Sequence, residues 1–575
     1  MAGGEARGQR HVGESATILS MATRSEWNIQ KSEAVSTGAM ITAEHPLAAE
    51  AGARILRDGG NAVDAAVAAA FAMGVVEPTT SGLGGVAWCV IREPDGTITT
   101  IDGAGAAPVR ATPDMYELQS RGAAGMYGWP ATKGDVQNVG YRSVGRMGAV
   151  GCLCHALERY GRMDRPSVMR DAIALAADGW ETDWNLSLSL ALYYDRLAPV
   201  DASRAIFFRP SGAPLRAATG FEAGDRLVQR DLAASLRAIA ADGPEVLYRG
   251  ELGRRIVADV QAHGGLLSQG DFELFEVRER PPLAVEYRGL QLRTLPGASG
   301  AITTVEMLRI LEGFELGKTE ALSPMALHLI AEAQRRAFAD RFTYLADEAV
   351  VGSAIYERLA SAEHAAAARA TIDPGRATPQ AAATPVPPSS DCTTHVNVID
   401  REGRMCSLTT TLGGAFGSGV VAAGTGIMLA NVMTWFDPRP GRSNSIAGGK
   451  RILSAIAPML LLRGSTPFVC TGAPGGRRIM SAMLHVVTNL VDWAQPPQQA
   501  VNGARSHCEG APLLIDTRVP QPTRDALAAM GHTVSPKLET FASSHFARPS
   551  AIVVRGSEKR AGVGALKSST AIGVD

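Results

Sequence analysis

Two adjacent threonines, Thr393 and Thr394, stand where an Ala/Pro-rich stretch gives way to a strand-like stretch. The preceding residues, 361–392, have no hydrophobic period and little to pack, which indicates a flexible linker. A hydroxyl residue at the start of a buried strand can attack the carbonyl carbon of the residue before it, here Cys392, and break the chain. The freed α-amine of Thr393 then acts as the base for its own hydroxyl. Composition alone favours a simpler interpretation, an ordinary domain linker that ends at a β-strand.

A hairpin would give this threonine a partner. Two strand-like stretches flank the loop Arg401–Gly403, and glycine at the third loop position suits the left-handed conformation that such turns need. If residue 400 pairs with residue 404, Thr393 lies opposite Thr411, with β-carbons about 5 Å apart and hydroxyls within reach of each other. A slip of one residue would place Thr410 or Leu412 there instead. Strand propensity alone also explains a run of threonines.

Two further motifs could support acyl chemistry. Gly475 and Gly476 precede an expected helix and can turn two backbone N–H groups toward one point, an arrangement that stabilises a developing oxyanion. A glycine pair before a helix is more often only a tight turn. Ser454 is another candidate hydroxyl, and it is equally explained as an ordinary loop serine.

Bulk composition excludes several classes of protein. The chain has 575 residues, a net charge of −1 and 20% charged residues, so nothing indicates a nucleic-acid surface. No apolar run reaches membrane-spanning length, and the first residues lack a secretory signal, so a cytoplasmic protein is expected. Seven scattered cysteines indicate no disulfide framework. Cys152 and Cys154 are too close for half of a zinc site, so neither a metal nor another cofactor is expected.

The expected elements suggest a layered α/β body. Residues 1–37 are polar and predict an irregular extension, and residues 145–320 predict a long helical section. A hairpin is expected from strands at Val86–Arg92 and Thr97–Asp102. Helices are expected at Leu47–Leu56, at Ala62–Gly74 behind an Asn61 cap, from Ser323-Pro324 onward, and at Ile479–Leu490.

From about residue 38 to its end, the chain resembles the γ-glutamyltranspeptidases, which are N-terminal-nucleophile hydrolases made as one chain and cut in two. The resemblance rests on a series of motifs in order: Gly59–Ala66, Ser81–Gly85, Ala331–Ala333, Ala339–Arg341, Thr393–His395, Phe416–Gly419, Lys450–Ser454 and Pro474–Gly476. It implies an αββα sandwich that cleaves itself between Cys392 and Thr393. The products would be a large subunit, 38–392, and a small subunit, 393–575.

The resemblance also implies roles for single residues. Thr393 would be the nucleophile, its α-amine the general base, and Thr411 its hydrogen-bonding support. Gly475 and Gly476 would form the oxyanion hole, and Ser454 would lie beside the acyl group.

The substrate pocket departs from the family pattern. Members that act on glutathione hold the α-carboxylate of the glutamyl group with an arginine and a serine, and its α-ammonium with an asparagine, a glutamine and an aspartate. These positions here hold Ala104, Ala455, Gly413, Val432 and Trp435, respectively. A buried carboxylate without its cation costs several kcal/mol, so we expect the pocket to reject the charged head of glutamate. A shift of the loop could still bring Asp437 into a nearby role.

The sequence therefore predicts a self-processing amide hydrolase or acyltransferase that works through an acyl ester on Thr393. Its substrate would be a small amide other than a γ-glutamyl compound, with water or an amine as acceptor. The two fragments would form a heterodimer, either single or paired with a second one, and neither nucleic acid nor a membrane is expected as a partner. In a first alternative the enzyme is an authentic γ-glutamyltransferase or glutathione hydrolase, with a carboxylate pocket rebuilt from Arg110, Arg439 or Arg442. The simpler interpretation of these arginines is that they are solvent-exposed surface residues. In a second alternative the chain is a non-catalytic relative that serves as a binding or structural protein.

Overall fold

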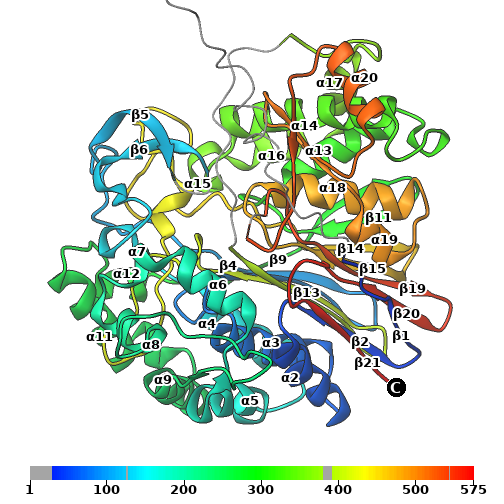
Figure 1. The fold of residues 1–575 in the computed structure, drawn as a ribbon. Coiled ribbons are helices and arrows are strands. Elements are labelled where there is room, and N and C mark those ends of the chain that lie inside the picture. Colours follow the sequence, from blue (N-terminus) through cyan, green and yellow to red (C-terminus); the bar gives the residue numbers. More distant parts are fainter. Residues whose placement is uncertain (1–28, 125–126, 380–391, 543) are drawn as a thin grey trace, which may run out of the picture. The chain divides into compact units, whose positions relative to one another are not determined.

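The hairpin around Gly403 lies at the centre of one of two stacked antiparallel sheets in the computed structural model (Figure 1). The structure describes residues 29–124, 127–379, 392–542 and 544–575. The hairpin sheet contains, in spatial order, β21 (Thr570–Val574), β2 (Ala39–Ala43), β12 (Thr394–Ile399), β13 (Met405–Thr411), β3 (Val86–Arg92), β4 (Ile98–Gly103) and β9 (Arg278–Arg280).

The second sheet packs face to face on the hairpin sheet. It contains β1 (Ala34–Ser36), β20 (Glu558–Gly562), β19 (Ser550–Arg555), β15 (Thr466–Gly472), β14 (Met459–Arg463), β11 (Leu290–Thr294) and β10 (Leu283–Tyr287). Contacts of β12 and β13 with β15 join the two sheets. Every residue of β12 and of β13 is buried, because one face of the hairpin meets this second sheet and the other face meets helices.

Helices cover the outer face of each sheet, which gives four layers (Figure 1). The hairpin sheet is covered by α2 (Pro46–Arg57), α3 (Ala62–Val76) and α4 (Ala149–Tyr160), with α5 (Arg165–Asp178) and α9 (Arg230–Asp242) packed beyond them. The second sheet is covered by α13 (Ala301–Glu312), α18 (Arg478–Val491) and α19 (Pro497–Asn502), with α14 (Pro324–Tyr344), α17 (Ala362–Ala370) and α20 (Gln521–Ala529) outside. This is the predicted αββα sandwich.

Shorter elements connect these layers. The remaining helices are α6 (Trp184–Leu192), α7 (Tyr194–Leu197), α8 (Asp201–Phe207), α10 (Glu245–Tyr248), α11 (Glu251–Ala262), α12 (Gln269–Glu273), α15 (Glu348–Val351) and α16 (Ser353–Leu359). Three small sheets are formed by β5 (Leu118–Ala124) with β6 (Trp129–Thr132), by β7 (Trp180–Glu181) with β8 (Arg226–Leu227), and by β16 (Ser506–His507), β17 (Leu513–Asp516) and β18 (Val534–Lys537). No helix among the described residues has the length and apolar composition needed to cross a bilayer.

Helix α3 shows how the sequence builds the layer behind the nucleophile. It is rich in alanine and every one of its residues is buried, so it fits between the hairpin sheet and the helices α2, α4 and α5. Its predicted cap is present: Asn61 Oδ1 accepts from the N–H groups of Val63 and Asp64, while Asp64 accepts from the N–H of Asn61. Asp400 accepts the next N–H, that of Ala62, at 3.1 Å, which fastens the helix start to the hairpin turn.

Three expectations about local structure were wrong in part. Ser361 caps a regular helix, α17, so the start of the 361–392 segment is ordered by packing against α13 rather than being flexible linker; residues 380–391 lie outside the described part. The end of the 1–37 extension forms β1, because β20 offers a partner edge, and residues 1–28 lie outside the described part. The helical section 145–320 also supplies β9, β10 and β11 to the two main sheets.

The cap of α3 can be tested by substitution. Asn61→Ala removes the oxygen that satisfies two buried N–H groups, so we expect it to lower the free energy of unfolding by about 1 kcal/mol, measured by urea denaturation. Asn61→Ser, which keeps an accepting oxygen, should lose less. Equal stability of the two variants would show that the cap contributes nothing.

Candidate active site

Thr393 lies immediately before β12, at the centre of the hairpin sheet, and its side chain is buried. The observed register pairs Thr394 with Thr410, so Thr393 faces Thr411, as the turn predicted. The Thr393 hydroxyl donates to Thr411 Oγ1 over 3.0 Å. Thr411 Oγ1 also accepts from the N–H of Gly413 at 3.0 Å, which fixes the position of the supporting hydroxyl.

The backbone at Thr393 is strained. Its φ angle is +79°, in the left-handed region that β-branched residues rarely enter. Such a conformation costs of the order of 1–3 kcal/mol and persists only where the surroundings enforce it. The strained torsion is about the N–Cα bond of Thr393, directly beside the Cys392–Thr393 peptide bond that self-cleavage would break.

The glycine pair Gly475-Gly476 forms the turn between β15 and α18. Both residues have positive φ angles, 138° and 56°, and a Cβ at Gly475 would lie 2.5 Å from that of Ala547. Among the described residues, neither N–H group donates a hydrogen bond, so both are available to an anion at the start of α18.

Two contacts connect this turn with the Thr393 end of the hairpin sheet. The His395 ring packs against Gly472, at the end of β15. Burial lowers the pKa of Arg478, in the first turn of α18, and the Cys392 thiol is close enough to oppose that effect. The end of β15, from which the turn continues, therefore lies against β12, whose start carries the scissile bond.

Ser454, in the loop before β14, presents an unused hydroxyl. Its Oγ is fully buried and has no hydrogen-bond partner among the described residues. The backbone is held on both sides, because its N–H donates to Ala298 at 3.1 Å and its carbonyl oxygen accepts from Arg341 at 2.8 Å. A buried hydroxyl without a partner costs about 1–3 kcal/mol, which a bound acyl group that accepts from it can recover.

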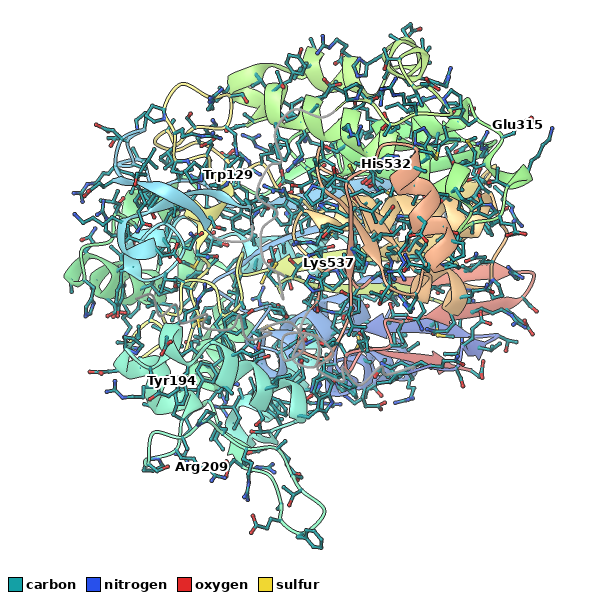
Figure 2. All side chains as sticks on the ribbon, turned by 45° about the horizontal axis from the view of Figure 1, so that its top comes forward. Trp129, Tyr194, Arg209, Glu315, His532 and Lys537 are labelled. Atoms are coloured by element: carbon teal, nitrogen blue, oxygen red, sulfur yellow. The ribbon has the colours of Figure 1, made fainter. Side chains whose placement is uncertain are left out.

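A pocket of about 620 Å³ is lined by Leu453, the residue before Ser454, and is walled by aromatic rings. Thr393, Ser454 and the glycine pair are not among its lining residues. Tyr127 stacks on Trp129 with ring centroids 6.1 Å apart and lies 6.5 Å from Trp435, while Phe342 meets Trp129 edge-on. Figure 2 shows Trp129 on the β5–β6 hairpin, from which it reaches this wall. The aromatic surface suits a flat or aliphatic acyl group.

The same pocket is rich in arginine. Four guanidinium groups line it, from Arg341, Arg439, Arg442 and Arg477. Arg477 stands over the rings of Tyr127, Trp129 and Phe342, and pairs with Glu509 at 2.6 Å. Burial alone would raise the pKa of Glu509, but Arg477 and His507 outweigh that effect and hold it well below its usual range.

The charges of the other three arginines are balanced differently. Arg439 binds Asp437 through two atoms, at 2.9 and 2.7 Å. Burial lowers the pKa of Arg341 to about 10, so its guanidinium remains charged at neutral pH. Within the described part of the chain, neither Arg341 nor Arg442 forms an ion pair, and Arg442 is exposed at the pocket rim. The pocket therefore offers positive charge to an incoming ligand.

The substrate positions inferred from the sequence fall into two groups. Trp435 lines the pocket, and a Cβ on Gly413 would lie 3.0 Å from its ring, so these two positions are neighbours. Ala104, Val432 and Ala455 are buried and are not among the lining residues: Val432 packs on Gly105 and Gly145, and Ala455 packs on Gly300.

The arginines also correct an expectation. Arg439 and Arg442 lie at the pocket rather than on remote surface, because the loop that carries them folds back and Asn444 donates to the carbonyl oxygen of Trp435. Arg110 is exposed and does not line the pocket. Sequence reasoning missed the wall formed by Tyr127, Trp129 and Phe342, which are dispersed along the chain. Arg477 follows the glycine pair directly, a signal that could have been used.

Comparison with known proteins identifies this architecture. A family model described as Gamma-glutamyltranspeptidase matches residues 48–571. The chain belongs to this family. Over 511 residues it is 39% identical to the Acylase ACY 1 proenzyme of Pseudomonas sp. (strain SE83), an alignment that covers 88% of this chain and 89% of the relative. Over 515 residues it is 34% identical to the glutathione hydrolase proenzyme of Escherichia coli (strain K12), covering 87% and 86%.

A solved structure supports the same assignment. The crystal structure of the cephalosporin acylase from Bacillus halodurans matches with a TM-score of 0.84 and 26% identity, covering 96% of this chain and 99% of that one. Relatives of the γ-glutamyltranspeptidase family named as proenzymes, both acylases and glutathione hydrolases, match over most of the chain. The chain is a self-processing amide hydrolase or acyltransferase of the N-terminal-nucleophile type.

Self-cleavage tests the assigned nucleophile. Thr393→Ala removes the attacking hydroxyl, so a denaturing gel should show one band of about 60 kDa that incubation does not change. Thr411→Val should slow cleavage strongly, because it removes the hydroxyl that orients Thr393, and Thr411→Ser should restore it. Cleavage at the wild-type rate in Thr411→Val would show that this hydroxyl supports neither processing nor the nucleophile.

Proposed function

We propose that the chain is an acylase that hydrolyses small amides through an acyl ester on Thr393, and that its acyl group carries a carboxylate but no α-ammonium. The observation that carries this proposal is the indole of Trp435 beside Gly413. A Cβ on Gly413 would lie 3.0 Å from that ring and 2.2 Å from Asn431 Oδ1, so no side chain fits there without movement. In family members that act on glutathione, these two positions hold ammonium ligands.

The acidic residue among those that line the pocket already has an ion-pair partner. Asp437 lines the pocket, but its two oxygens are bound by Arg439, which leaves its charge neutralised. An α-ammonium placed here would lose its hydration, while the nearby oxygens of Asp437 and Asn431 already accept hydrogen bonds from Arg439 and from the N–H of Gly414. Such a buried, unpaired charge is strongly unfavourable. The pocket therefore selects against the amino-acid head of a γ-glutamyl group.

A carboxylate is treated differently from an ammonium. Arg442 has no ion-pair partner in the described part of the chain, and guanidinium groups bind carboxylates through paired hydrogen bonds. This refines the expectation that the pocket rejects the charged head of glutamate: the handle for the α-ammonium is absent, while cations remain for an anion. The cephalosporin acylase among the structural neighbours supports testing substrates in which the acyl group is joined to a bulky amine.

The proposed mechanism uses residues of this chain only. The α-amine of Thr393, freed by self-cleavage, takes the proton from Oγ1 as Oγ1 attacks the amide carbon. The N–H groups of Gly475 and Gly476 stabilise the oxyanion. The α-ammonium then returns the proton to the leaving amine, and the acyl group stays on Oγ1 as an ester. Water, or an acceptor amine, attacks that ester and releases the free acid or a new amide.

Both fragments would remain together after cleavage. In the hairpin sheet, β12 and β13 of the small subunit, 393–575, pair with β2 and β3 of the large subunit, 38–392. In the second sheet, β14 pairs with β11 and β20 pairs with β1, so strands from before the cleavage site flank those of the small subunit on both sides. Separation would break backbone hydrogen bonds in both buried sheets. We therefore propose an interlocked heterodimer.

Two alternatives remain as outcomes of experiment. Of the two, an authentic γ-glutamyltransferase or glutathione hydrolase with a rebuilt carboxylate site is the better supported, because Arg439 and Arg442 lie at the pocket. A non-catalytic relative would have no physical need for the Thr393–Thr411 hydrogen bond, the free N–H groups and the unused Ser454 hydroxyl in one place.

A matched pair of substrates tests the acyl preference. Glutaryl-p-nitroanilide equals γ-glutamyl-p-nitroanilide without the α-ammonium, so we expect kcat/KM for the glutaryl compound to be higher by at least about tenfold, or about 1.4 kcal/mol. Release of p-nitroaniline measures both. A preference for the γ-glutamyl compound would support the transferase alternative instead, and turnover of neither would move the search to larger acyl groups.

The carboxylate contact can be tested with two exposed arginines. Arg442→Ala should raise KM for glutaryl-p-nitroanilide about fivefold, the effect of losing about 1 kcal/mol from a partly solvated ion pair. Arg110→Ala, which removes the same charge away from the pocket, should leave KM unchanged. Equal effects of both variants would indicate general electrostatic attraction rather than a contact.

The free α-amine predicts a pH dependence. An α-amino group has a pKa of about 8, and only its neutral form accepts the proton of Thr393. We expect kcat/KM to fall about tenfold per pH unit well below pH 8 and to level off above it. A profile that is flat between pH 6 and 8 would contradict the role of the α-amine.

A further inference from the structure

Two groups of side chains outside the pocket have the chemistry of metal ligands. The first contains His328, Glu332 and His532, and the second contains Glu306, Asp340 and His364. In each group, one candidate ligand atom from every residue lies within 4.8 Å of the others. Their surroundings decide whether an ion could be held.

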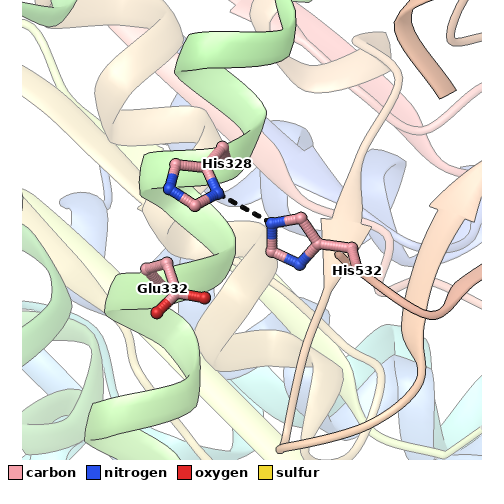
Figure 3. A group of neighbouring side chains, drawn as sticks. All are labelled: His328, Glu332 and His532. Carbon is pink, nitrogen blue, oxygen red and sulfur yellow. Dashed lines mark hydrogen bonds between the residues drawn. The ribbon is translucent and has the colours of Figure 1, made fainter. Parts of the chain in front are cut away.

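The first group is already saturated by hydrogen bonds and ion pairs. Figure 3 shows the His328 ring on α14 turned toward His532, with Nδ1 and Nε2 2.8 Å apart. The other ring nitrogen of His328 bonds to the carbonyl oxygen of Asp373 at 2.8 Å. Glu332 is paired with Arg335 and Arg336, at 2.8 and 2.6 Å. A cation would have to displace two guanidinium groups, so we assign this group a structural role.

The second group joins three helices. Glu306 comes from α13, Asp340 from α14 and His364 from α17. His364 Nε2 lies 3.1 Å from Glu306 Oε1 and 2.9 Å from Asp340 Oδ2. The Glu306 side chain is fully buried, whereas 19% of His364 and 23% of Asp340 is exposed. The group therefore has a closed inner side and an opening to solvent.

Two observations distinguish it from the first group. Glu306 Oε2 is buried and accepts no hydrogen bond from any residue that the structure describes. No lysine or arginine of the described residues pairs with either carboxylate, whose only ion-pair partner there is His364. Two acidic side chains thus share one imidazole. Burial and the neighbouring Asp340 raise the pKa of Glu306, because its charged form is poorly compensated when no cation is present.

We infer that Glu306, Asp340 and His364 form a binding site for a divalent ion of the Zn²⁺ type, with water completing its coordination. One imidazole nitrogen and two carboxylate oxygens suit Zn²⁺, whereas Mg²⁺ and Ca²⁺ prefer oxygen ligands alone. Two carboxylates balance the charge of the ion. Tetrahedral bonds of about 2.0–2.1 Å place ligand atoms about 3.3 Å apart. The two spacings to His364 Nε2, 3.1 and 2.9 Å, therefore need to widen only slightly.

The ion would act as a staple for the segment before the cleavage site. It would bind α17, which begins the segment 361–392, to α13 and α14 of the outer helical layer. Helix α14 also carries Arg341, which holds the Ser454 carbonyl oxygen. The site is separate from the nucleophile, so the inference does not depend on the proposed substrate.

Metal titration of the processed enzyme tests the site. After treatment with a chelator, titration calorimetry with Zn²⁺ should show one ion bound per chain, and Zn²⁺ should raise the unfolding temperature. Co²⁺ should give the visible absorption of a low-symmetry site with nitrogen and oxygen ligands. His364→Ala and Glu306→Gln should each weaken Zn²⁺ binding by at least about tenfold, because each removes a ligand.

Matched variants make the test decisive. His263→Ala removes an exposed histidine that lies 3.4 Å from Asp259, an ordinary surface pair, and should leave binding unchanged. If Glu306→Gln does not fold, the His364→Ala variant still tests the site, because the His364 side chain is partly exposed and its removal disturbs the core less. Absence of saturable binding, or binding that survives both ligand variants, would overturn the inference. Binding is read without any amide substrate, so failure of the proposed acylase activity is a separate result.

Discussion

The pairing of β12 with β13 is the constraint on which the rest of the site depends. Its register places Thr393 opposite Thr411, and the 3.0 Å hydrogen bond between their hydroxyls follows from that register. A shift of one residue would turn every side chain of β12 to the other face. The two neighbouring strands, β2 and β3, hold the hairpin from both sides, and Asp400 ties its turn to the start of α3.

The hairpin sheet explains how the strained backbone at Thr393 is maintained. A buried sheet that is hydrogen-bonded on both sides can hold one residue at a φ of +79°, because relaxing it would disturb the whole hairpin. The same rigidity keeps the turn of Gly475 and Gly476 at the end of the adjacent sheet. Catalytic geometry of this kind is supplied by the backbone, so substrate preference can change without altering it.

The pocket is built from other parts of the chain. Its aromatic wall and its arginines come from the β5–β6 hairpin, from α14, and from the loops after β13 and β15, none of which forms the central hairpin. The Trp435 ring occupies the space beside Gly413. The two positions that hold ammonium ligands in relatives acting on glutathione are therefore neighbours here, and the ring of one fills the space left by the other. Helix α14 links the parts, since it contributes Arg341 and Phe342 to the pocket and Asp340 to the inferred metal site.

The sequence by itself determined the local features. The cap at Asn61, the turn at Gly403, and hence the Thr393–Thr411 pairing all follow from short-range rules, because turn type and strand period set the register. Family motifs then indicated the αββα fold and the chemistry. Composition misjudged the start of the 361–392 segment, since packing against α13 makes a helix of residues that have no strong period of their own.

Only the tertiary structure decided the substrate pocket and the side-chain clusters. Tyr127, Phe342 and Arg477 are separated by more than a hundred residues each, and no local spacing indicates that they meet. The same holds for Glu306, Asp340 and His364, which sit on three helices and escape any search for closely spaced ligands. Contacts of this kind depend on how the layers stack, and stacking is set by the sum of many buried surfaces rather than by any one segment.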